Sequence, residues 1–117
     1  MSVEYLGVKI FLDEVRASGE VWVARGTYHN IYALQLDRTG LSLPVWSSRA
    51  RVVDFLKHAR LVGSRYEPSA VDLDVFTQTW LADQRMAITE VQLNPDGKSP
   101  RVLVLTNEEF KEFRSSS

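Results

Sequence analysis

Cysteine is absent from this chain of 117 residues, and histidine occurs only twice. The lack of cysteine excludes disulfides, thiolate catalysis and cysteine-based zinc sites, and it fits a reducing compartment. His29 and His58 lie far apart and match no spacing of metal ligands, so we expect neither a metal nor a cofactor. The six glycines are scattered along the chain and do not form a phosphate-binding loop.

Long apolar runs are also missing. No stretch approaches the roughly 18 apolar residues that a membrane span requires. Glu4, Lys9 and Asp13 interrupt the first apolar segment, so it does not read as a signal peptide. We therefore expect a cytoplasmic protein that makes no contact with a membrane.

A large charge of one sign is absent as well, since the net charge is −1. A nucleic-acid-binding domain usually carries a basic excess over its whole length, so nucleic acid is not the expected partner. Residues 47–66 nevertheless contain five basic residues and one acidic residue. This leaves open, as an alternative, a nucleic-acid contact through the basic helix expected at residues 49–60.

The composition is that of an ordinary globular protein, with 44% apolar and 25% charged residues, and the length fits a single domain over residues 1–117. Hydrophobic periodicity and turn residues predict helices at 2–18, 48–60, 73–84 and from about 107 onward. Strands are predicted at 20–25, 31–36, 41–46, 66–71, 87–93 and 101–105, with turns at 37–40 and 94–97. This order predicts an α+β fold: a mainly antiparallel sheet, formed by a three-stranded meander and a C-terminal hairpin, with helices packed against it.

The first helix carries two apolar stripes. One stripe, expected to face the core, consists of Val8, Phe11, Leu12 and Val15. A second stripe on another side consists of Val3, Leu6 and Ile10. It either packs on another part of the same chain or forms the contact of a homodimer.

The segment from Leu43 to Arg49 is the most informative one, because a strand passes into a helix there almost without a loop. Ser47 and Ser48 can cap that helix, and Pro44 predicts a strand edge or a bulge. Trp46 alternates with Leu41, Leu43 and Val45, so we expect it on the less buried face, as part of a partner surface. The candidate binding residues are Trp46, Ser47, Ser48, Arg49, Arg51 and Tyr28.

Catalytic patterns are weak. Ser47, His58 and Asp54 contain the groups of a hydrolytic triad, but Asp54 and His58 are ordinary helix neighbours, and no glycine-flanked nucleophile turn accompanies them. Asp72 and Asp74 are explained by helix capping. We therefore assign no catalytic residue.

Several motifs resemble a known bacterial family. They are Glu20-Val21-Trp22, Leu43-Pro44-Val45-Trp46, Tyr66-Glu67-Pro68, Leu73-Asp74-Val75-Phe76 and Trp80-Leu81. In order and spacing they resemble the domain of unknown function 2750 family (DUF2750) over roughly residues 6–93. The corner that ends in Ser47-Ser48 is also similar to the enhanced-serine-sensitivity protein family. The resemblance implies a small cytoplasmic protein of a bacterium or phage, and it brings no activity or site residues with it.

The leading functional hypothesis is a small non-catalytic protein-binding module, such as an immunity-like or regulatory partner of another protein. Its first alternative is the nucleic-acid contact through residues 49–60. Its second is an uncharacterised enzyme that uses Ser47 or His58.

Overall fold

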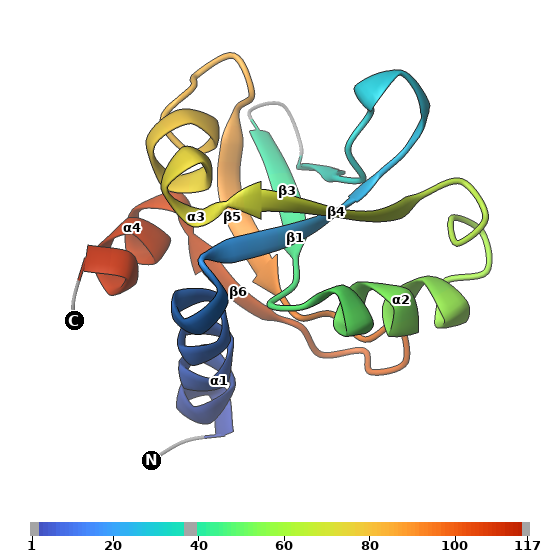
Figure 1. Ribbon diagram of the computed structural model, residues 1–117, viewed down its shortest axis with the longest axis horizontal. Helices are drawn as coiled ribbons and strands as arrows, with labels where there is room; N and C mark the ends of the chain where they lie inside the picture. Colours follow the sequence, from blue (N-terminus) through green and yellow to red (C-terminus); the bar gives the residue numbers. More distant parts are fainter. Residues whose placement is uncertain (1–2, 37–39, 116–117) are drawn as a thin grey trace.

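The computed structural model describes residues 3–36 and 40–115, so most of the turn predicted at 37–40 lies outside the described part. Its elements, in chain order, are α1 (Val3–Ser18), β1 (Glu20–Arg25), η1 (Thr27–His29), β2 (Leu34–Leu36), β3 (Gly40–Val45), α2 (Arg49–His58), β4 (Glu67–Asp72), α3 (Leu73–Val75), η2 (Phe76–Trp80), β5 (Ile88–Leu93), β6 (Leu103–Thr106) and α4 (Asn107–Ser115). Helices pack against strands that are mostly paired in an antiparallel way (Figure 1). This confirms the predicted α+β class.

The strands form two sheets. Four strands lie in the order β2-β3-β5-β6, where β3 and β5 are parallel and the other pairs antiparallel. The predicted C-terminal hairpin is confirmed by the antiparallel pair β5–β6, and Gly97 in its loop takes the positive φ that the turn requires. A second sheet contains β1 and β4. The sheets meet where the backbones of Trp22 and Trp46 exchange two N–H···O bonds of 2.8 Å.

The predicted three-stranded meander is only partly correct. β2 and β3 form an antiparallel pair, but β1 is paired along all six of its residues with β4 instead of β2. Only the isolated bridge between Arg25 and Ile31 links β1 to the segment before β2. The other side of β3 pairs with β5, which lies about 48 residues later in the chain. β2 pairs with β3 only as far as Ser42. Pro44 therefore lies beyond the end of this pairing, where the missing N–H of proline breaks no hydrogen bond with β2, as predicted.

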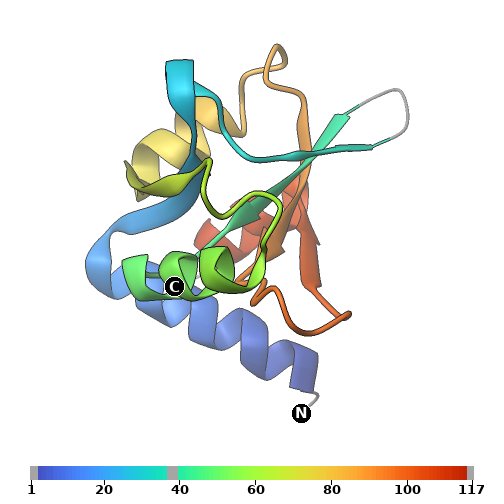
Figure 2. The same ribbon diagram turned by 90° about the vertical axis from the view of Figure 1, so that its right-hand side faces the viewer.

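Two apolar clusters lie on opposite faces of the strands. The larger cluster includes Leu43 and Val45 of β3, together with buried residues of α1, β1, β5 and α4. The smaller cluster consists of Ala24, Trp46, Val52 and Phe55 as its buried residues. It lies under α2, which faces the viewer in Figure 2. Both faces of the strand end at Val45–Trp46 are therefore covered.

Capping residues place the helix ends as the sequence indicates. The Ser48 hydroxyl accepts a hydrogen bond from the Arg51 N–H at the start of α2, and the Asp72 carboxylate accepts two at the start of α3. At α4, the Thr106 hydroxyl accepts from the Glu109 N–H while the Glu109 carboxylate accepts from the Thr106 N–H, which is a capping box.

The helix predicted at 73–84 is shorter than expected. After α3 the chain continues as the π-helical turn η2, in which the Leu81 N–H donates to the Phe76 carbonyl. The wider turn brings residues five apart to the same side, and both Phe76 and Leu81 are buried in the larger cluster. The Thr77 hydroxyl donates to the Leu73 carbonyl at 2.7 Å. It therefore competes with backbone N–H groups for this carbonyl, which disturbs the α-helical hydrogen bonds. No helix among the described residues is long and apolar enough to cross a membrane.

Candidate functional site

Trp46 is buried, so the expectation that it lies on the less buried face is wrong. Its indole Nε1 donates to the Pro95 carbonyl at 2.7 Å, and its ring lies against Phe55 with the ring centroids 5.0 Å apart. The strand alternation does separate Trp46 from Leu43 and Val45. However, α2 covers the face on which Trp46 lies. The alternating residues at the end of β3 therefore face two different apolar clusters, and neither face of the strand meets solvent here.

Ser47 joins three parts of the chain that are distant in sequence. Its N–H donates to the Asn94 Oδ1 at 2.9 Å, and the Asn94 Nδ2 donates to its hydroxyl at 3.1 Å. The hydroxyl in turn donates to a carboxylate oxygen of Glu14 on α1. Asn94 holds the left-handed backbone, with φ of 50°, that Asn tolerates better than most residues. Ser47 is buried, and this network locks the corner against α1 and the β5–β6 loop.

Arg51 completes the network from the first turn of α2. Its Nε and Nη2 donate to the two carboxylate oxygens of Glu14, each at 2.9 Å. These bonds, with a smaller contribution from the Ser47 hydroxyl, hold the pKa of the Glu14 carboxyl below its usual value. Neither Glu14 nor Asn94 was among the predicted site residues, because nothing local in the sequence marks a partner so far away in the chain.

The other predicted site residues do not gather at this corner. Ser48 is engaged as the helix cap, while Arg49 is exposed. Tyr28 is 94% exposed in η1, and its φ of 56° is strained for a residue with a bulky side chain. It lies in a different part of the molecule from the corner that contains Trp46, Ser47 and Arg51 (Figure 1).

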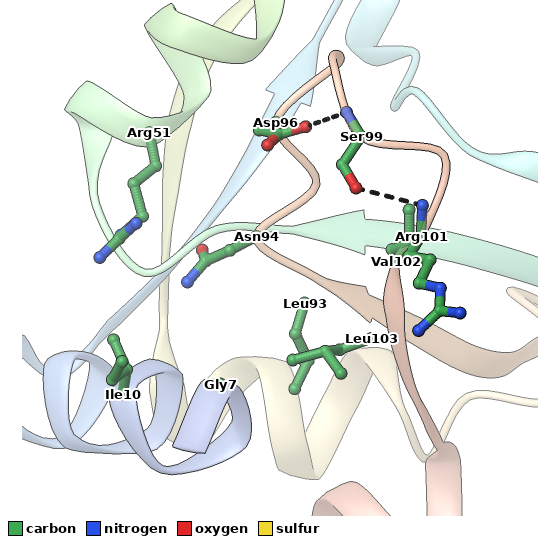
Figure 3. A pocket seen from close by; sticks show the side chains of 10 residues that line it. All are labelled: Gly7, Ile10, Arg51, Leu93, Asn94, Asp96, Ser99, Arg101, Val102 and Leu103. Atoms are coloured by element: carbon green, nitrogen blue, oxygen red, sulfur yellow. Dashed lines mark hydrogen bonds between the residues drawn. The ribbon is translucent and has the colours of Figure 1, made fainter. Parts of the chain in front are cut away.

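A groove of about 290 Å³ opens beside the network, between α1 and the segment that leads into β6 (Figure 3). Its base is apolar and includes Leu93 and Leu103. Gly7 allows Leu103 to lie against α1, since a Cβ at this position would stand only 2.2 Å from the Leu103 Cδ1. Ile10 and Val102 line the same groove while remaining 48% and 37% exposed. This α1–β6 groove therefore offers apolar surface that the fold does not use.

The rim of the α1–β6 groove is polar. Arg51 and Asn94 lie on one side of it, and Arg101 lies at the other end (Figure 3). Asp96 also lines the groove, and its Oδ1 accepts the N–H groups of Lys98 and Ser99 at 2.8 Å each. A second hollow, of about 180 Å³, adjoins the groove because it shares Arg51, Asn94 and Asp96.

The second apolar stripe of α1 takes part in this surface. Phe11, Leu12 and Val15 of the first stripe are buried, whereas Leu6 and Ile10 of the second stripe are exposed. The side chain of Val3 lies outside the described part. Of the two expectations for the second stripe, packing within the chain does not hold for Leu6 and Ile10. Self-association stays a prediction.

The triad that the sequence suggests on paper is not assembled. Ser47 precedes α2 and His58 is its last residue, so the length of the helix, about 15 Å, separates them. The His58 Nδ1 lies 2.8 Å from the Asp54 backbone carbonyl and 3.8 Å from its carboxylate. Within residues 3–36 and 40–115 there is also no cluster of three side chains that could hold a metal ion.

Comparison with known proteins supports the resemblance seen in the sequence. The model of the family described as "Protein of unknown function (DUF2750)" matches residues 8–113, which is nearly the whole chain. The comparison with curated proteins found no match. The match takes in the corner at Trp46 and Ser47, the Asn94 loop and the strands on both sides of the groove. The chain therefore belongs to the DUF2750 family.

Proposed function

We propose that the chain is a small non-catalytic protein-binding module, acting as a regulatory or immunity-like partner, and that it binds through the α1–β6 groove. The observation that carries the proposal is the exposed apolar pair Ile10 and Val102 on either side of an apolar base with a polar rim. Apolar surface surrounded by polar groups is the usual composition of a protein–protein contact.

The state of the corner favours binding over catalysis. The Ser47 hydroxyl is buried and engaged with Glu14 and Asn94, so it is not presented to a substrate. The bidentate contact between Arg51 and Glu14 fixes α2 to α1 beside the groove. Because the rim is already fixed, it loses less conformational entropy when a partner binds.

The experiment is capture of partners from a native host extract with tagged protein, followed by mass spectrometry. Ile10→Glu and Val102→Glu place a charge in the groove and should abolish the capture of partners, because a desolvated charge opposes binding. Val75→Glu is the matched control, since Val75 is a similarly exposed apolar residue outside the groove. Unfolding temperatures of all three variants should stay close to that of the wild type.

A set of captured proteins that is the same for wild type, Ile10→Glu and Val102→Glu would refute the groove as the binding site. Ser47→Ala and His58→Ala test the competing enzyme hypothesis. Both should retain the biological activity of the chain. A loss of activity without unfolding in either variant would contradict the proposal that the chain acts by binding alone.

A further inference from the structure

A second surface lies at the right-hand end of the molecule in Figure 1, where the loop around η1 and the loop between α2 and β4 project. Its most exposed apolar residues are Tyr28, at 94%, and Leu61, at 89%. Arg60 and Arg65 are exposed on the loop between α2 and β4, and Lys57 is exposed in the last turn of α2, which leads into that loop. We call these five residues the basic loop surface.

The two loops are held together through Tyr66. Its ring packs against Tyr32 with the centroids 5.4 Å apart, and both rings belong to the smaller apolar cluster. A Cβ on Gly26 would stand 3.1 Å from the Tyr66 ring and 3.3 Å from the Arg65 carbonyl, so the two loops approach closely at this point. The basic loop surface is therefore fixed to the core at its base, while its side chains extend outward.

The positive charge of this surface is not balanced by its neighbours. Over the described residues, Lys57, Arg60 and Arg65 make no ion pair with a carboxylate. Asp54, the acid on the same helix, is shared by His58 and Lys98. These cations are three of the five basic residues in the segment 47–66. The other two are Arg51, which pairs with Glu14, and Arg49, which is exposed.

The backbone of Tyr28 takes an unusual conformation, and its side chain contributes little to the fold. A tyrosine with φ of 56° is strained, and the chain keeps it there although the side chain is almost entirely in solvent. Tyr and Arg, together with Trp, are enriched among the residues that dominate binding energy at protein interfaces.

We propose that the basic loop surface binds an acidic segment of a partner protein, with Tyr28 and Leu61 as apolar anchors and Lys57, Arg60 and Arg65 as partners of its carboxylates. A protein fits this surface better than a nucleic acid does. Tyr28 offers a ring on which a base can stack, but Leu61 offers none, and the net charge of −1 for the whole chain opposes binding to a polyphosphate. This inference uses residues separate from the α1–β6 groove and does not depend on it.

The test is an amide NMR titration with a synthetic peptide of about twelve residues that carries several glutamates and two leucines. Its shifts should cluster at residues 26–30 and 57–66 and weaken as salt rises. The same peptide with glutamine in place of glutamate should cause no shifts. A combined Arg60→Gln and Arg65→Gln variant should lose at least about tenfold in affinity. Arg85→Gln is the matched control, because Arg85 is an exposed cation that belongs neither to the basic loop surface nor to the groove, and it should bind as the wild type does.

Tyr28→Asn separates binding from structure. Asparagine tolerates the left-handed backbone, so the unfolding temperature should stay the same or rise while the affinity for the peptide falls. The proposal is overturned if shifts gather at the groove, if the glutamine peptide binds equally well, or if millimolar peptide causes no shift. Tighter binding of a single-stranded oligothymidylate of similar length would also overturn it, in favour of nucleic acid.

Discussion

The burial of Trp46 can be tested by its contribution to the free energy of unfolding. Trp46→Ala removes the largest fully buried side chain, and substitutions of this kind cost about 3–5 kcal/mol. It also leaves the Pro95 carbonyl without its donor, which adds about 1–3 kcal/mol. A chain of this length has a total stability on the order of 5–15 kcal/mol, so a combined loss of about 4–8 kcal/mol should remove a large part of it.

Trp46→Phe gives the same test in a protein that folds. The ring against Phe55 is kept and the indole N–H is lost, so we expect a loss of about 1–3 kcal/mol. Urea unfolding should be followed by far-ultraviolet circular dichroism, because the substitution itself changes the fluorescence. Tyr28→Phe is the control and should be neutral, since Tyr28 is exposed. The packing argument is refuted if Trp46→Ala unfolds at the same urea concentration as this control.

Three further predictions concern the network and the backbone. Arg51 lowers the folded-state pKa of Glu14, so this contact stabilises the fold above about pH 4.3. The stabilisation is lost as the pH falls through the lower folded pKa. Urea unfolding midpoints measured from about pH 7 to 2.5 should therefore decline less steeply in Glu14→Gln than in the wild type. Gly63→Ala should cost about 1–3 kcal/mol in thermal unfolding, because its Cβ would stand 2.1 Å from the Leu56 carbonyl oxygen, and an unchanged midpoint would contradict this. Thr106→Ala should cost about 1 kcal/mol by loss of the α4 cap, and a neutral result in the same assay would mean that the cap does not hold the helix.

Elements whose signals are local could be predicted from the sequence. The helix starts at Ser48, Asp72 and Thr106 follow from side chains that cap within three residues, and Gly97 marks the hairpin loop by its backbone freedom. These interactions need no information about the rest of the chain.

Features set by distant contacts could not be predicted in the same way. The alternation of β3 identifies its two faces, but it does not tell that β5 is its neighbour or that α2 covers the face of Trp46. The π-helical turn at Phe76 places Leu81 in the same apolar cluster as Phe76. The free energy gained by this burial outweighs the intrinsic preference of the segment for an α-helix, and local sequence does not reveal it. The partners of Ser47 are residues 14 and 94, which are distant in the chain. The sequence therefore indicates the corner but does not indicate that Ser47 turns inward to contact them.

The parallel pairing of β3 with β5 has a consequence for the order in which the chain folds during synthesis. β2 and β3 can pair early, and β1 and β4 can pair once residue 72 has left the ribosome. The other edge of β3 has no partner until residue 93 has been made. Until then β3 exposes an unpaired strand edge, which is prone to associate with other chains. Truncations within residues 73–93 should therefore aggregate more readily than the full chain, and expression of such fragments would show this as loss of soluble protein.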